Sequence, residues 1–455
     1  MGKTYYSKLV KGYEKDLIKN LYNFVAINSQ YDEKTVSEKN PFGEGVSKAL
    51  DFIACLAKKD GFMVTNYANK VVEIIVGEGK KNITIMAHAD VVPEGNGWTH
   101  DPFKVIDRKG ILVGRGVADD KGPCLSAYYA LKALRDHKLL GDYKVRFLVG
   151  GNEEKGSACM EYYFKTLKKE QPTLGFSPDS SFPVVYAEKN MSSFKINKKI
   201  SVPGIISVKG GNVINAVIDQ CEVKVEIDNG FLQYILKNFK DNEAKIVTRD
   251  DISTITFYGK SAHGSMPQCG VNAGVMALKA LAGYYNSSNL KDFVEKIDSL
   301  DGSSFNGYYH DKAGDSTSNV GIISWENGCL ELHMDYRYFS ETALGVIRRR
   351  ILKVFDREKV TFLVDPIPLY FSPKSKLITT LVKSYQEETG DLKTKPMAIG
   401  GGTYAKEANN VVAYGMEFPG FETNMHGVDE QIEKESLFKG MAIYANAIIA
   451  LGKIL

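Results

Sequence analysis

Several features that often assign a sequence to a class are missing from this one. Its six cysteines are scattered and form no CxxC pair, which fits free thiols in a reducing compartment better than a disulfide framework. The first residues contain no apolar signal core, and no hydrophobic run is long enough to cross a bilayer. We therefore expect a cytoplasmic protein without a membrane partner.

An excess of charge of one sign is missing as well. The 58 basic and 55 acidic side chains are interspersed along the chain and leave a formal net charge of +3. This balance does not indicate a basic patch that would bind nucleic acid, and no basic amphipathic stretch indicates binding to a membrane surface. We therefore expect no nucleic-acid partner.

The chain does have the length and composition of an ordinary globular protein. Of its 455 residues, 44% are hydrophobic and 25% are charged, close to the average for folded proteins. Such a chain can bury a full core over about two to three domains without disulfides or structural metals. Any metal that it binds is therefore available for chemistry.

Helices and buried strands alternate near both ends of the chain. The strands expected at residues 83–87 and 145–149 are apolar on both faces, as buried central strands are, and the helices around them indicate an α/β domain. Strands in the middle of the chain are more polar and more alternating. The simplest interpretation is one α/β domain formed by residues 1–188 and 372–455, with residues 189–371 inserted as a second domain.

Two of the expected strands end in side chains that suit metal chemistry. His88 and Asp90 follow the first strand on one face, which fits a metal-binding histidine oriented by an aspartate, or equally a packed histidine beside a capping aspartate. Glu153 and Glu154 follow the second strand, where a charge is costly unless it is compensated. A metal would compensate one glutamate and leave the other as a general base, although an exposed turn is the more common setting for such a pair.

Three further positions fit the same chemistry. Asp119 and the next residue, Asp120, precede an expected helix, where they could cap its N-terminus or supply a bridging metal ligand. Asp179 and His426 lie in expected loops, and each alone is weak evidence, because a single histidine is more often structural than a ligand. The combination is stronger, since all of these residues fall in the two terminal segments and none falls in the insertion.

A series of sequence blocks carries these residues in a fixed order: MAHADVVPEGNGWTHDPF (86–103), GRGVADDKGP (114–123), GGNEEKGS (150–157), FSPDSSFPVVYAEK (176–189), SAHGSMPQCGVNA (261–273), GGGTYA (400–405) and MHGVDE (425–430). Together they resemble the superfamily of co-catalytic di-zinc hydrolases that includes aminoacylase, carboxypeptidase G, succinyl-diaminopimelate desuccinylase and carnosinase. The resemblance is closest to its bacterial dipeptidase V branch. It implies a phosphorylase/hydrolase-like α/β/α catalytic domain with the insertion as an α+β lid domain.

The resemblance also implies a set of metal ligands. His88 and Asp179 would bind one divalent ion, Glu154 and His426 would bind a second, and Asp119 would bridge the two. One histidine with carboxylates at each position suits Zn²⁺, and Mn²⁺ or Co²⁺ is compatible with the same ligands. The family joins the bridging aspartate to the following residue by a cis peptide.

The remaining catalytic roles are implied in the same way. Asp90 would orient His88, and Glu153 would take the proton from the attacking water and pass it to the leaving amine. In the lid, His263 matches a histidine that stabilises the tetrahedral oxyanion, a task for preorganised donors. Arg337 matches an arginine that holds a substrate carboxylate, with a structural salt bridge as the alternative.

Two lid features match less well. Asn215 corresponds to a substrate-binding asparagine, but Asn-Ala-Val-Ile stands here where the family has Asn-Met-Val-Pro. The glycine-rich residues 400–403 either bring backbone amides to the substrate or form an ordinary tight turn.

We therefore predict a dipeptidase that cleaves dipeptides and short peptides with a free N-terminus. An N-acyl-amino-acid deacylase or desuccinylase would share its ligands and base, and a catalytically inactive binding homologue is the alternative from another class. The dipeptidase V resemblance implies a monomer, because in that branch one chain supplies what dimeric relatives take from a partner subunit.

Overall fold

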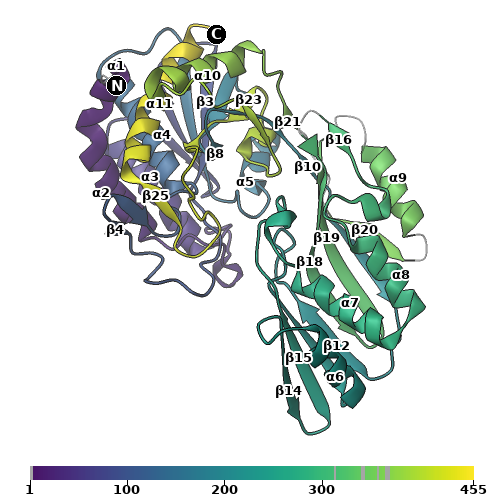
Figure 1. The fold of residues 1–455 in the computed structure, drawn as a ribbon. Helices are drawn as coiled ribbons and strands as arrows, with labels where there is room; N and C mark the ends of the chain where they lie inside the picture. The colour runs from purple at the N-terminus through teal and green to yellow at the C-terminus, as the bar shows by residue number, and fades with distance from the viewer. Residues whose placement is uncertain (1–3, 312–313, 340–343, 356–357, 364–368) are drawn as a thin grey trace. The chain divides into compact units, whose positions relative to one another are not determined.

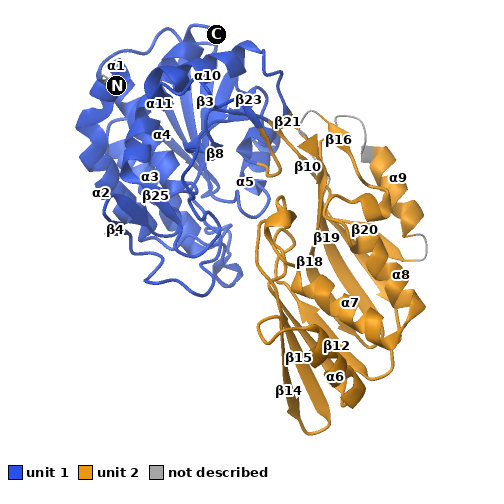
Figure 2. Cartoon of the chain, viewed as in Figure 1, with its two compact units in different colours: residues 1–186, 370–397, 403–455 blue, residues 187–369, 398–402 orange. Residues whose placement is uncertain are grey.

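The chain forms two compact units, shown in different colours in Figure 2. The structure, a computed structural model, describes residues 4–311, 314–339, 344–355, 358–363 and 369–455. Unit 1 comprises Met1–Tyr186, Tyr370–Met397 and Thr403–Leu455, and unit 2 comprises Ala187–Leu369 and Ala398–Gly402.

Unit 1 is built on a mixed sheet (Figure 1). Its strands follow the order β1 (Met63–Tyr67), β2 (Val71–Val76), β6 (Lys144–Gly150), β3 (Asn82–His88), β7 (Leu174–Ser177), β23 (Val411–Ala413) and β9 (Val185–Glu188). The four central strands β6, β3, β7 and β23 are parallel. Every residue of β3 is buried, as the apolar sequence of this strand predicts for the middle of a parallel sheet.

Unit 1 also contains several helices. They are α1 (Tyr5–Val10), α2 (Glu14–Val25), α3 (Glu44–Lys59), α4 (Lys121–Asp136), α5 (Ala158–Glu161), α10 (Lys376–Thr389) and α11 (Lys434–Gly452). Helices α4 and α11 contact each other and β3, while α3 contacts β1, β2 and β6. Smaller strands complete the unit: β4 (Ile106–Arg108), β5 (Ile111–Val113), β8 (Ser180–Ser181), β24 (Met416–Glu417) and β25 (Gln431–Glu433).

Unit 2 is built on an antiparallel sheet with its own core. The strand order is β14 (Ala244–Arg249), β15 (Ile252–Tyr258), β13 (Gln220–Glu226), β12 (Ile205–Gly210), β18 (Thr317–Glu326), β19 (Cys329–Tyr338), β11 (Phe194–Lys199) and β20 (Lys359–Phe362). Burial alternates along β13 and β15, so one face of the sheet is covered.

The helices of unit 2 are α6 (Asn229–Asn238), α7 (Ala273–Tyr285), α8 (Ser288–Ile297) and α9 (Leu344–Val354). Helix α7 contacts β12, β13, β15 and β18. The predicted fold class, an α/β catalytic domain with an inserted α+β lid domain, is confirmed. Among the described residues, no helix combines the length and the apolar character that crossing a bilayer requires.

Candidate active site

Three neighbouring parallel strands of unit 1 end at one edge of the sheet, and predicted site residues lie at or shortly after the end of each. His88 is the last residue of β3, Glu153 and Glu154 come shortly after β6, and Asp179 comes shortly after β7. Because β6, β3 and β7 are adjacent and parallel, their carboxyl ends lie together, the usual position for chemistry in such sheets.

Two loops add the remaining candidate ligands. Asp119 lies two residues before α4 begins at Lys121, and the peptide that joins it to Asp120 is cis, as the resemblance implies. Asp120 accepts a hydrogen bond from the backbone N–H of His88 at 3.0 Å, which ties this loop to the end of β3. His426 lies in the loop before β25.

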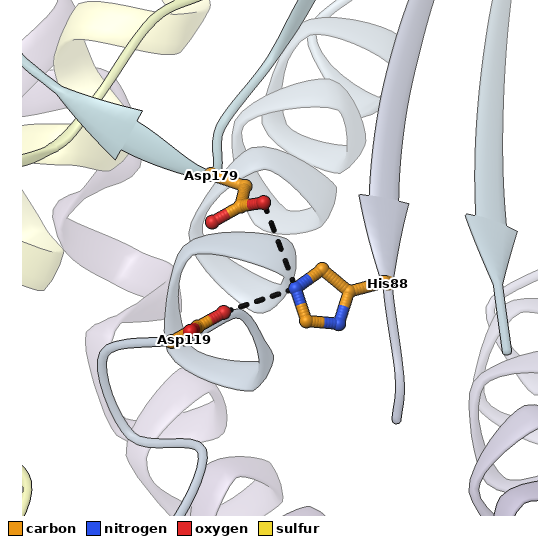
Figure 3. A group of neighbouring side chains, drawn as sticks. All are labelled: His88, Asp119 and Asp179. Atoms are coloured by element: carbon orange, nitrogen blue, oxygen red, sulfur yellow. Dashed lines mark hydrogen bonds and ion pairs between the residues drawn. The ribbon is translucent and has the colours of Figure 1, made fainter. Parts of the chain in front are cut away.

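The carboxylate of Asp119 lies between two histidines. Its Oδ1 is 3.0 Å from His88 Nε2, and its Oδ2 is 2.8 Å from His426 Nε2. Asp179 Oδ2 is 3.7 Å from the same nitrogen of His88 (Figure 3), and Glu154 Oε2 is 3.4 Å from that of His426. The predicted ligands thus form two groups of three that share Asp119, and each could hold a metal ion.

Asp90 organises the residues around His88. The Asp90 carbonyl oxygen lies 3.0 Å from His88 Nδ1, a contact that leaves Nε2 to face the carboxylates if Nδ1 carries the proton. The Asp90 carboxylate accepts hydrogen bonds from the backbone N–H groups of Glu153 and Glu154, both at 3.1 Å. One aspartate therefore connects the ends of β3 and β6, a contact that the sequence analysis did not anticipate.

Burial and the neighbouring charges shift the pKa values of the carboxylates in these groups. Burial and the charge of Asp119 raise the pKa of Asp179 to about 8 and also raise the pKa of Glu154. Burial alone would raise the pKa of Asp119 as well. Hydrogen bonds with His426 and His88 outweigh this effect and hold its pKa well below the usual value. In the described part of the chain, Glu154 Oε1 is buried without a hydrogen-bond partner. Oxygen and imidazole ligands in this arrangement fit divalent metal ions.

Glu153 lies beside this cluster and belongs to neither group of potential ligands. Burial, reinforced by the charge of Asp179, raises the pKa of Glu153 well above its usual value. A carboxyl group of this kind holds a proton more readily than an exposed one.

Glu430 is a buried carboxylate whose contacts the sequence analysis did not predict. It accepts hydrogen bonds from Arg115 Nη1 at 2.8 Å and from the backbone N–H groups of Gly116, Ala118 and Asp119 at 3.0, 2.8 and 3.1 Å. The signal available in the sequence was its place at the end of the MHGVDE block, four residues after His426.

Arg115, the ion-pair partner of Glu430, also contacts the loop that carries His426. Its Nη2 donates to the carbonyl oxygens of Pro93 and Gly427 at 3.2 and 3.0 Å. The pair formed by Arg115 and Glu430 therefore joins the loop that carries Asp119 to the loop that carries His426.

The other predicted site residues belong to unit 2. His263 Nδ1 lies 2.6 Å from Ser265 Oγ, and the backbone N–H of Gly264 donates to the carbonyl oxygen of Asn215 at 2.7 Å. The structure therefore brings the segments of Asn215 and His263 together within this unit.

Arg337 is almost fully buried and already has an acidic partner. Its Nε donates to both carboxylate oxygens of Asp335, its Nη2 donates to Asp335 Oδ2 at 2.7 Å, and its Nη1 donates to the carbonyl oxygen of Gly400 at 2.7 Å. The structural salt bridge that was the alternative for Arg337 is thus present. Its role in binding a substrate carboxylate stays a prediction.

Comparison with known proteins places these features in context. Residues 84–450 match the model of peptidase family M20/M25/M40. The Staphylococcus aureus (strain MW2) protein named "Putative dipeptidase MW1694" is 33% identical over 97% of this chain and 98% of its own length. Human carnosine dipeptidase 1 has a similar structure, with a TM-score of 0.60 and 15% identity over 98% of both chains. An M20 family metallo-carboxypeptidase from Sulfolobus solfataricus has a TM-score of 0.59 and 16% identity over 97% of this chain and 100% of its own.

Proposed function

The chain belongs to peptidase family M20/M25/M40, and we propose that within this family it acts as a dipeptidase with a two-metal centre. Membership in this metallopeptidase family implies divalent metal ions. The observation that carries the two-metal proposal is the position of Asp119, whose two carboxylate oxygens face two different histidines.

The proposed ligands follow the two groups around Asp119. His88 and Asp179 would hold one ion, His426 and Glu154 would hold the other, and Asp119, which belongs to both groups, would contribute to each. Zn²⁺ is the preferred ion, and Mn²⁺ or Co²⁺ fits the same ligands. When bound, the ions would supply Lewis acidity that activates water and polarises the scissile carbonyl.

Glu153 is the proposed general base and acid. It takes one proton from the attacking water, and it returns this proton to the amine nitrogen as the C–N bond breaks. Its raised pKa suits this role, because the carboxyl group must hold the proton between the two steps. Asp90 supports the reaction indirectly, since it accepts hydrogen bonds from the backbones of Glu153 and Glu154.

Three residues of unit 2 are proposed to contact the substrate. His263 donates to the carbonyl oxygen where negative charge develops, Arg337 faces the substrate carboxylate, and Asn215 contributes a further polar contact. Among the described residues, Arg337 donates three of its five N–H groups, to Asp335 and Gly400. The proposed substrates are dipeptides and short peptides with a free N-terminus, and the proposed form is a cytoplasmic monomer.

A substrate panel tests this proposal. Metal-stripped protein is reloaded separately with Zn²⁺, Mn²⁺ or Co²⁺ and incubated with free dipeptides, N-acetylated dipeptides, N-acyl amino acids and tripeptides. We expect metal-dependent cleavage that is fastest for free dipeptides. Preference for the acylated compounds would instead assign the protein to the deacylases, and no cleavage with any ion would contradict an enzymatic role.

A further inference from the structure

One ring nitrogen of His263 receives two contacts from Ser265. The backbone N–H of Ser265 donates to His263 Nδ1 at 3.4 Å, and the Ser265 hydroxyl lies 2.6 Å from the same nitrogen. A backbone N–H can only donate, so Nδ1 must be the acceptor, and the hydroxyl must then also donate to it. In a neutral imidazole the proton is consequently on Nε2.

We propose that Ser265 is a positioning residue that fixes His263 as the neutral Nε2–H tautomer. This inference rests on the proposed function, in which His263 donates a hydrogen bond to the substrate carbonyl oxygen. With Nδ1 accepting from Ser265, Nε2 carries the proton and is the nitrogen that would donate to the developing negative charge. The opposite tautomer would present a lone pair to the oxyanion and would repel it.

Gly400 makes room for Ser265 in this position. A Cβ atom on Gly400 would lie 2.5 Å from Ser265 Cβ, which is too close for two carbon atoms. The carbonyl oxygen of Gly400 is in turn held by Arg337 Nη1 at 2.7 Å. The glycine-rich turn therefore fixes one side of the His263–Ser265 segment.

The Asp335–Arg337 pair fixes the other side. A Cβ atom on Gly264 would overlap Asp335 Oδ2, so this carboxylate packs directly against the turn. The Arg337 guanidinium holds Asp335 through Nε and Nη2. A backbone hydrogen bond from Met266 N to His263 O, at 2.9 Å, closes the turn. Arg337 thus supports the placement of His263 through both Asp335 and Gly400.

Nitrogen-15 NMR of histidine-labelled holoprotein reads the tautomer directly, with the His263 signals assigned by their loss in His263→Asn. We expect the Nε2–H form in the wild type and a mixture of tautomers in Ser265→Ala. Gly400→Ala, which displaces Ser265 without removing its hydroxyl, should give the same mixture. Ser253→Ala is the matched control, because Ser253 is a buried serine of unit 2 whose hydroxyl bonds to Thr248; it should change neither the spectrum nor the activity.

The kcat of Ser265→Ala gives a second readout. Loss of a complete oxyanion donor typically lowers kcat by about 10²–10³-fold. In Ser265→Ala, kcat should therefore fall in proportion to the fraction of the Nδ1–H tautomer that NMR detects, with an unchanged metal content. An Nδ1–H tautomer in the wild type, or a spectrum of Ser265→Ala that still shows the Nε2–H form alone, would overturn the proposal. The NMR result does not depend on turnover, so failure of every substrate with the expected tautomers present would contradict the proposed function and leave the assignment of Ser265 intact.

Discussion

The backbone N–H of Asp119 donates a hydrogen bond to Glu430 Oε1 at 3.1 Å. Asp119 belongs to both candidate metal groups, and Glu430 lies in the loop that carries His426. The separation between a proposed bridging ligand and a proposed terminal ligand is therefore set by a buried carboxylate that belongs to neither metal group.

Replacing Glu430 should affect both stability and metal binding. In Glu430→Gln, Arg115 loses its buried anionic partner, and removing one member of a buried ion pair typically costs about 3–5 kcal/mol. Loss of support behind a metal ligand typically weakens metal affinity by about 10–100-fold. Thermal unfolding and chelator competition measure the two effects. Glu161→Gln, in the exposed pair with Lys165, is the control and should change neither.

Replacing Glu153 should separate chemistry from metal binding. Glu153→Ala removes the proposed base but none of the five proposed ligands, so both ions should remain bound. Turnover should fall by about 10²–10⁴-fold, the usual contribution of general acid–base catalysis. Metal analysis and dipeptide hydrolysis on the same sample give both quantities, and normal turnover would exclude this mechanism.

Replacing Asp90 should instead weaken metal binding. Asp90→Ala removes the acceptor for the backbone N–H groups of Glu153 and Glu154. The affected residues include one proposed ligand, so we expect metal affinity to fall by about 10–100-fold. Chelator titration checks this expectation, and wild-type affinity in the variant would mean that Asp90 does not organise the site.

The metal-free protein should become less stable as the pH rises from about 5 to 8. Asp179 has a pKa of about 8 in the folded protein, against an ordinary value of 3.8. The folded state therefore binds more protons than the unfolded state within this range, and its stability decreases with pH. The raised pKa of His88 acts in the same direction. Thermal unfolding of chelated protein at several pH values tests this prediction.

Bound metal should reverse this trend. Metal binding requires the deprotonated ligands, and binding to the folded state alone stabilises it, by about 2.7 kcal/mol at a free metal concentration of 100 times Kd. The metal-loaded protein should thus gain the most stability over the metal-free protein near pH 8. An equal gain at pH 5 and pH 8 would contradict the involvement of Asp179 and His88.

The metal-binding candidates could be predicted because the sequence blocks that carry them resemble those of a known family, whereas local patterns alone left alternatives open at each position. In the fold, His88 ends β3 while Glu154 and Asp179 follow β6 and β7, and parallel strands bring their carboxyl ends to one edge. The supporting contacts could not be predicted in the same way. Glu430 and Arg115, or Ser265 and Gly400, are distant in sequence and meet only through tertiary packing, which no local pattern specifies.

One missed element did leave a local signal. Strands β18 and β19 form a long hairpin that the sequence analysis did not identify. The residues between them include Asn327 and Gly328, both with positive φ, and Asn-Gly is the typical dipeptide of a tight hairpin turn. The alternation along residues 317–326 is irregular, because the register shifts between Val320 and Ile322, and this explains why strand periodicity alone did not reveal the hairpin.

The central claim is that Asp119 bridges two metal ions, and anomalous X-ray diffraction from crystals of the zinc-loaded protein tests it most directly. We predict two anomalous peaks, one beside His88 Nε2 and one beside His426 Nε2, with one carboxylate oxygen of Asp119 coordinating each. A single peak, or two peaks of which Asp119 contacts only one, would contradict the two-metal centre.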